Sequence, residues 1–159
     1  MGKIRLLIAD DHEMVRTGLR KVLENETDME VIGEATDGRE TVDKIQSLRP
    51  DVAIIDIAMP QLSGLEAINT VRESGLDTRM VILSLHKKDA YVHQALLCGA
   101  LGYLVKPTQA TVMLEAIRTV YGGDYFLSPQ IHSDFINDYL RQLKEQGGPA
   151  RPGSAGYRI

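Results

Sequence analysis

The stretch IRLLIADDHE, residues 4–13, decides the fold class, because a short apolar run ends in two adjacent carboxylates. The run from 4 to 9 has the length and the apolar character of a strand that is buried on both faces. Neighbouring carboxylates repel each other, so their place at the end of a buried strand needs a reason. A local reason is available, since aspartate is a favoured N-terminal cap and stabilises the dipole of a following helix.

Four more apolar runs follow, over 30–35, 51–56, 79–84 and 102–106. Segments with helical spacing of apolar residues separate them. Helices are expected around Val15, Leu19, Val22 and Leu23, over 38–48, 64–73 and 88–98, and around Val112, Ala116, Ile117 and Val120. Strands that alternate with helices predict a parallel sheet covered on both faces, which is the doubly wound α/β class.

Composition narrows the function. The chain has 159 residues, 43% of them hydrophobic, which suits one globular domain with a short appendage. With a net charge of -4, the chain lacks the excess of basic residues that is typical of nucleic-acid binding. The single cysteine, Cys98, allows no intramolecular disulfide and favours a reducing compartment, so a cytoplasmic location is expected. The first apolar run is too short for a signal sequence or a membrane span, and no membrane association is expected.

Polar side chains stand at the ends of four of the expected strands. Asp10 and Asp11 follow the first, Asp56 ends the third, Ser84 ends the fourth and Lys106 ends the fifth. Parallel strands bring their carboxyl ends to one edge of the sheet, where ligands of open α/β folds bind. Three clustered carboxylates resist ionisation unless a cation is near, and Mg²⁺ prefers such oxygen ligands. A cap at the first helix explains only one of these strand ends.

Two of the other positions, Asp56 and Lys106, also have a purely structural interpretation. Asp56 precedes Met59, Pro60 and Gly64 and so begins a loop, where aspartate is a common turn residue. Lys106 precedes Pro107, which biases its backbone to an extended form and permits a cis bond, so it can simply mark a strand exit. The combination is more specific than any single member.

The combination resembles the receiver domain of bacterial two-component response regulators over about residues 3–122. The matching features are "DD" after the first strand, "D-x-x-M-P-x-x-x-G" after the third, a hydroxyl residue ending the fourth and "K-P" ending the fifth. The resemblance implies a flavodoxin-like sheet with strand order 2-1-3-4-5. It implies that Asp56 is the phosphoacceptor, that Asp10, Asp11, Asp56 and the backbone carbonyl of Ala58 hold Mg²⁺, that Ser84 and Tyr103 are switch residues, and that Lys106 pairs with the phosphoryl group.

The chemistry implied by this resemblance is phosphoryl transfer, which needs an in-line nucleophile and positive charge on the transferring group. The donor is a phosphohistidine of a sensor histidine kinase, or a small phosphodonor such as acetyl phosphate, and the product is an aspartyl phosphate. The domain then catalyses only its own phosphorylation and dephosphorylation. In the family, Ala58 and His86 occupy the positions that set the lifetime of the phosphoryl group, and phosphorylation pairs receivers as homodimers.

Two rival classes use a related sheet. A phosphatase of the haloacid dehalogenase type also has an aspartate nucleophile, Mg²⁺ and a lysine, but it needs a second acid two residues after the nucleophile, where this chain has Ala58. A flavodoxin-like flavin binder has no use for three carboxylates beside an anionic cofactor, and the chain contains no tryptophan to stack on the ring. Both are therefore disfavoured.

The pattern changes after residue 122. Ser128 and Pro129 have the form of a cap followed by a first-turn proline, and an apolar stripe predicts a sixth helix. The stripe comprises Ile131, Phe135, Ile136, Tyr139, Leu140 and Leu143. We expect a receiver over 1–122, a linker with an amphipathic helix over 123–145 and a flexible tail over 146–159.

"GG-x-Y-F-L-SP", beginning at Gly122, is similar to the junction of NarL/FixJ response regulators, in which a linker leads to a LuxR-type helix-turn-helix domain. That DNA-binding domain is absent from the chain, so DNA binding is expected only through it in a longer protein. A naturally single-domain receiver that acts through protein partners is the alternative. His12 is interpreted as a helix-start residue, because no second histidine or cysteine stands at a ligand spacing for zinc.

Overall fold

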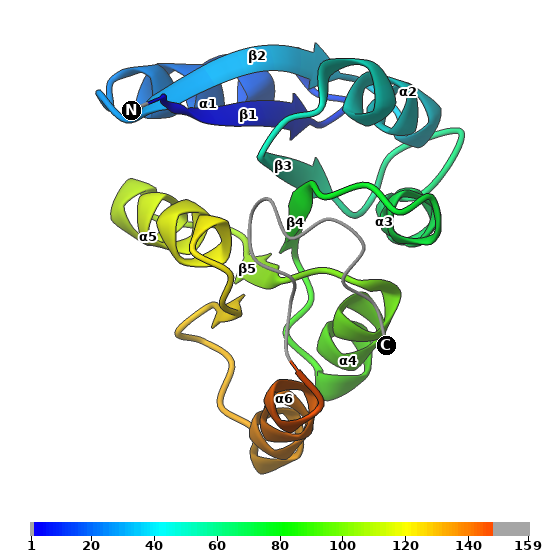
Figure 1. The fold of residues 1–159 in the computed structure, drawn as a ribbon. Helices are drawn as coiled ribbons and strands as arrows, with labels where there is room; N and C mark the ends of the chain where they lie inside the picture. The colour runs from blue at the N-terminus through cyan, green and yellow to red at the C-terminus, as the bar shows by residue number, and fades with distance from the viewer. Residues whose placement is uncertain (1, 148–159) are drawn as a thin grey trace.

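Six strands and six helices alternate along residues 2–147, the part of the chain that the computed structural model describes (Figure 1). The strands are β1 (Ile4–Ala9), β2 (Met29–Ala35), β3 (Val52–Asp56), β4 (Arg79–Ser84), β5 (Gly102–Val105) and β6 (Phe126–Leu127). The helices are α1 (Glu13–Glu24), α2 (Gly38–Leu48), α3 (Gly64–Glu73), α4 (Asp89–Cys98), α5 (Ala110–Tyr121) and α6 (Asp134–Glu145). The five expected strands are confirmed to within one residue at each end.

All strand pairs are parallel, and the sheet order is β2-β1-β3-β4-β5-β6. The doubly wound class and the order 2-1-3-4-5 are thus confirmed. Strand β6 was not expected from the sequence; it pairs Phe126 with Gly102 and Leu127 with Tyr103. Two residues are too few to show the period-2 pattern by which a strand is recognised.

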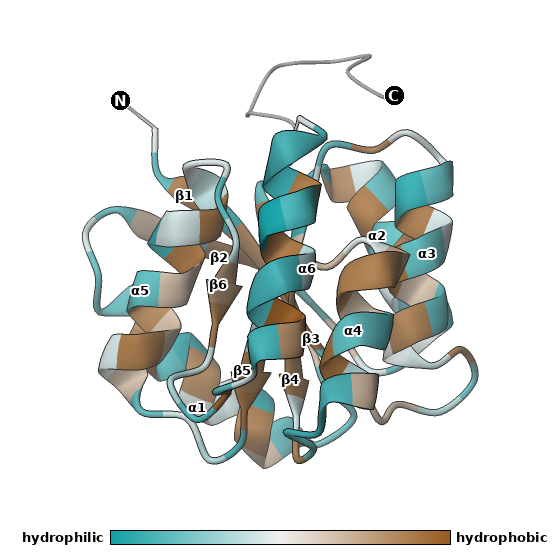
Figure 2. Cartoon of the chain, turned by 90° about the horizontal axis from the view of Figure 1, so that it is seen from below, coloured by the Kyte–Doolittle hydropathy of each residue, from teal (hydrophilic) through white to brown (hydrophobic). Residues whose placement is uncertain are grey.

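Apolar cores lie on both faces of the sheet, which explains why the strands are apolar throughout. Leu7 and Ala9 of β1 face the core beneath α2, α3 and α4, whereas Leu6 and Ile8 face the core beneath α1 and α5. Figure 2 shows the brown strands enclosed between these two groups of helices, whose outer faces carry more teal.

The start of α1 differs from the capping interpretation. His12 is the N-cap and makes no side-chain cap bond, whereas Ser63 and Glu66 form a capping box at α3. The Asp10 carboxylate accepts a hydrogen bond from the His12 N–H at 2.8 Å, an arrangement that turns the chain before the helix. The acidic pair therefore does not cap the helix.

Helix α6 begins later than expected. Its N-cap is Ser133, whose Oγ accepts from the Ile136 N–H and donates to the Asp89 carboxylate at the start of α4. Ser128 is not a helix cap, because its hydroxyl is engaged by the edge of β5, where it accepts from the Val105 N–H at 3.1 Å. The fully buried Ile136 packs α6 into the core on the α4 side of the sheet, and Figures 1 and 2 show the two helices side by side.

Between residues 2 and 147 the structure has no helix that is both long and apolar enough to cross a membrane. The tail expected over 146–159 lies outside the described residues from position 148 onward.

Candidate functional site

The carboxyl ends of the strands bring the predicted site residues to one edge of the sheet. Asp10 and Asp11 follow β1, Asp56 is the last residue of β3 and Ser84 is the last residue of β4. One ligand atom each from Asp10, Asp11, His12 and Asp56 lies within 4.8 Å of the others. The predicted convergence of the acidic residues is therefore present in the structure.

Asp56 is a buried carboxylate with a cationic partner. Its side chain lies 3.2 Å from the Lys106 Nζ, and its Oδ1 also accepts a hydrogen bond from the Ala58 N–H at 3.3 Å. Burial raises the pKa of Asp56 above its ordinary value, and the charge of Asp10 acts in the same direction. The Ala58 N–H and Lys106 act against this rise but do not cancel it. The carboxylate is consequently held in a site where additional positive charge would be stabilising.

The close packing of the segment after Asp56 explains the glycine of the sequence motif. Gly64 begins α3, and its N–H donates to the carbonyl oxygen of Ile57 at 3.2 Å. A Cβ at Gly64 would lie 2.7 Å from the Asp56 carbonyl oxygen, nearer than such atoms can approach. Only glycine lets the helix begin so close to the end of β3, which fixes the backbone of Asp56.

Asp10 has an unsatisfied oxygen. The residue is fully buried, and its Oδ2 has no hydrogen-bond partner among residues 2–147. A buried polar atom without a partner is costly, and a carboxylate oxygen is the ligand type that Mg²⁺ prefers. The acidic cluster therefore fits a divalent cation on the chemistry of its own atoms.

Arg16 supports the acidic pair, although it was not among the site residues expected from the sequence. Its Nη1 donates to the carbonyl oxygen of Asp10 at 2.8 Å, and its Nε pairs with Glu34 of β2 at 2.8 Å. Burial acts to raise the pKa of Glu34, but hydrogen bonds from Arg16 and Arg20 outweigh it and leave that pKa below its ordinary value. An arginine one turn into a helix carries no sequence signal for such a role.

Ser84 and Tyr103 both hold the loop between β4 and α4. The buried Ser84 Oγ accepts from the His86 N–H at 3.0 Å, and the Tyr103 hydroxyl donates to the His86 carbonyl oxygen at 2.6 Å. The Tyr103 ring is fully buried, and the His86 ring stacks on Tyr91 at 4.1 Å between centroids. The two predicted switch residues are thus joined through one loop residue, and the tyrosine already lies inside the fold.

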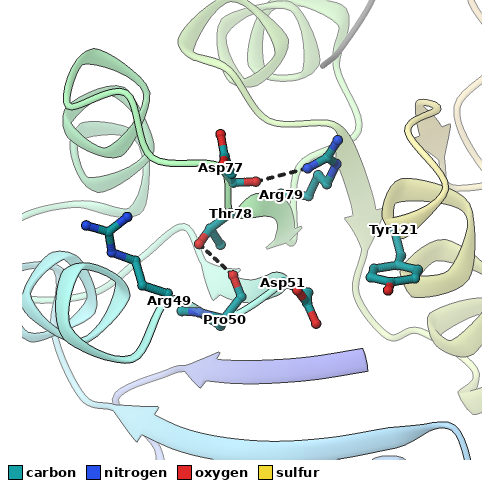
Figure 3. A pocket seen from close by; sticks show the side chains of 7 residues that line it. All are labelled: Arg49, Pro50, Asp51, Asp77, Thr78, Arg79 and Tyr121. Carbon is teal, nitrogen blue, oxygen red and sulfur yellow. Dashed lines mark hydrogen bonds between the residues drawn. The ribbon is translucent and has the colours of Figure 1, made fainter. Parts of the chain in front are cut away.

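A polar pocket lies at the opposite edge of the sheet from the acidic cluster, where β3 and β4 begin (Figure 3). Its volume is about 210 Å³, and its lining comprises Arg49, Pro50, Asp51, Asp77, Thr78, Arg79 and Tyr121. Thr78 donates to the Pro50 carbonyl oxygen at 2.7 Å, and Arg79 donates to that of Asp77 at 3.0 Å. The Thr78 bond ties together the loops that precede the two strands, whereas the Arg79 bond lies within the segment before β4. None of the predicted site residues lies here.

Comparison with known proteins places these features in a family. The family model of the response regulator receiver domain matches residues 6–118. Transcriptional regulatory protein DegU of Brevibacillus brevis is 34% identical over 144 residues, which cover 91% of this chain and 61% of DegU. Oxygen regulatory protein NreC of Staphylococcus carnosus is 38% identical over 138 residues, which cover 86% of this chain and 64% of NreC. The chain thus spans less than two thirds of either relative.

Among solved structures, the signal receiver domain of NarL from Mycobacterium tuberculosis matches with a TM-score of 0.70 and 34% identity, covering 74% of this chain and 98% of that domain. The family match, the relatives and the sheet order agree with one another. The chain therefore belongs to the response regulator receiver domain family, within its NarL/FixJ group.

Proposed function

We propose that this chain is the phosphorylation-controlled switch of a two-component system, with Asp56 as the phosphoacceptor. The observation that carries the proposal is the state of Asp56, which is 3% exposed and lies 3.2 Å from the Lys106 Nζ at the carboxyl edge of the sheet. A carboxylate is a competent nucleophile for phosphoryl transfer when it is held in place beside positive charge.

The transfer follows from these positions. An Asp56 oxygen attacks the phosphorus of a phosphohistidine on a sensor histidine kinase, the O–P bond forms, and the P–N bond breaks with return of its electron pair to the kinase imidazole. Lys106 would offset charge on the phosphoryl oxygens, and the Ser84 hydroxyl would donate a hydrogen bond to them. Acetyl phosphate serves the same nucleophile as a small donor.

A divalent cation completes the proposed site. Asp10, Asp11, Asp56 and the backbone carbonyl of Ala58 would hold Mg²⁺, which fits the unsatisfied Oδ2 of Asp10. When bound, Mg²⁺ supplies positive charge that stabilises the oxygens of the transferring group. The residues themselves orient the acceptor: the Ala58 N–H and Lys106 hold Asp56, and Arg16 holds the backbone of Asp10.

The proposed output is transcriptional. One relative is named a transcriptional regulatory protein, and the chain spans 61% of its length. We infer that this receiver works in the cytoplasm, that it forms a homodimer on phosphorylation, and that it controls DNA binding by a LuxR-type domain in a longer protein. The length of the native gene product separates this arrangement from a single-domain receiver that acts on protein partners.

The test is labelling by acetyl phosphate with Mg²⁺, read by intact mass. The wild-type chain should gain the mass of one phosphoryl group, and Asp56→Asn should gain none, because an amide is not a nucleophile for this transfer. Asp43→Asn is the matched control, since Asp43 is an exposed carboxylate of α2 away from the strand ends. Full labelling of Asp56→Asn would overturn the assignment of the acceptor.

A further inference from the structure

The His12 ring lies against the acidic pair. Its Nδ1 is 3.1 Å from the Asp10 Oδ1 and 3.0 Å from the Asp11 Oδ1. The ring is also 68% exposed, so it can adjust without disturbing the core. The sequence interpretation of His12 as a helix-start residue is correct for its backbone, which is the N-cap of α1, and in the metal-free protein the ring nitrogen is hydrogen-bonded to Asp10.

The spacing of these atoms matches that of neighbouring ligands on one metal ion. Two ligands about 2.1 Å from a six-coordinate cation and at right angles to each other are about 3.0 Å apart. The Nδ1 of His12 stands at this distance from two carboxylate oxygens at once. The nitrogen therefore already has, from each of two oxygens, the separation of two ligands that share a cation.

A second, independent observation points to a cation here. The Oδ2 of the fully buried Asp10 has no hydrogen-bond partner in the described part of the chain, although its Oδ1 is bonded to the His12 backbone. The four residues that offer ligand atoms within 4.8 Å of one another include His12 as well as the three aspartates. The donor set is thus mixed, with an imidazole beside the carboxylates.

We propose that His12 Nδ1 is an additional ligand at this site and gives it a preference for first-row transition cations over Mg²⁺. Imidazole suits ions such as Ni²⁺ and Zn²⁺, whereas Mg²⁺ is satisfied by oxygen ligands and water. The proposal rests on the cation site of the proposed function and adds a ligand that determines its metal specificity. The chemical class of the ion is a divalent cation that accepts one nitrogen donor.

The test compares binding of Ni²⁺ and Mg²⁺ by calorimetric titration at about pH 8, where an ordinary imidazole is neutral. Both ions are divalent and six-coordinate, so a change in the ratio of their affinities between variants reports the loss of the nitrogen donor. Four proteins are titrated beside the wild type: His12→Ala, His12→Gln, Asp10→Asn and His132→Ala. His12→Gln retains a polar side chain near the carboxylates without the imidazole, and His132 is an exposed histidine outside the cluster.

In both His12 variants the ratio of Ni²⁺ affinity to Mg²⁺ affinity should fall at least about tenfold, and in His132→Ala it should match the wild type. An unchanged ratio in the His12 variants would overturn the proposal, as would a parallel rise in both affinities, which would make the ring a competitor of the metal. Asp10→Asn should lose affinity for both ions. If it keeps both, the cation site of the proposed function fails instead.

Discussion

Replacement of Asp10 by asparagine should stabilise the metal-free protein. Ligand oxygens of Asp10 and Asp56 lie within 4.8 Å of each other, and both residues are buried. At an effective dielectric constant of about 20, two unit charges at this distance repel by about 3 kcal/mol. The Lys106 ammonium beside Asp56 offsets part of this repulsion, so we expect a net gain of about 1–3 kcal/mol. The asparagine Oδ1 can still accept the bond from the His12 N–H.

The assay is thermal unfolding with and without Mg²⁺. For a chain of this size each kcal/mol raises Tm by about 2–4 °C, so metal-free Asp10→Asn should melt above the wild type. Mg²⁺ should raise the Tm of the wild type by mass action and should have little effect on the variant. Asp43→Asn, which removes the same charge from the exposed face of α2, should match the wild type in both conditions. A metal-free Asp10→Asn that melts below the wild type would refute the argument from repulsion.

Three other predictions concern neighbouring groups. Asp11→Asn should weaken Mg²⁺ binding in a titration and slow labelling by acetyl phosphate, while circular dichroism shows an intact fold; an unchanged affinity would remove Asp11 from the site. Ser84→Ala should blunt the rise in dimer fraction that beryllofluoride with Mg²⁺ produces in analytical ultracentrifugation; a full rise would mean that the hydroxyl is dispensable. Glu34→Gln should lower Tm at about pH 7, because the ionised Glu34 stabilises the folded protein. The pKa of Glu34 is below its ordinary value in the folded state, so this stabilisation is present above the unfolded pKa and is lost as pH falls through the folded pKa. The difference from the wild type should narrow towards about pH 3, and a constant difference would contradict this linkage.

The architecture and the acidic cluster were predictable because both follow from periodicity. Runs that are apolar throughout require burial on both faces, such burial requires helices on both sides, and parallel strands then end at one edge. These steps place Asp10, Asp11 and Asp56 at one edge, and the three residues meet there because β1 lies beside β3, an order that the family resemblance implied. Their chemical roles rest on resemblance and on the experiments above.

Contacts made by single side chains were not predictable in the same way. Arg16 reaches the Asp10 carbonyl and the His12 ring reaches two carboxylates only through the particular turn between β1 and α1. Ser128 has the sequence features of a helix cap, but its hydroxyl bonds to Val105, 23 residues earlier in the chain. A tertiary partner outcompeted the local one, and local sequence carries no record of that partner.

The pairing of β6 with β5 has a consequence for association between chains. The N–H of Val105 is bonded to the Ser128 hydroxyl, the Ser128 N–H is bonded to the carbonyl oxygen of Tyr103, and the Phe126 N–H is bonded to that of Leu101. A strand edge whose polar groups are unpaired is a template for pairing with another molecule, and native proteins cover such edges. The segment 126–128 of the linker covers the edge of β5 in this way. A chain cut after Gly122 would lose it and should aggregate sooner on concentration, through the apolar edge that β5 would then present.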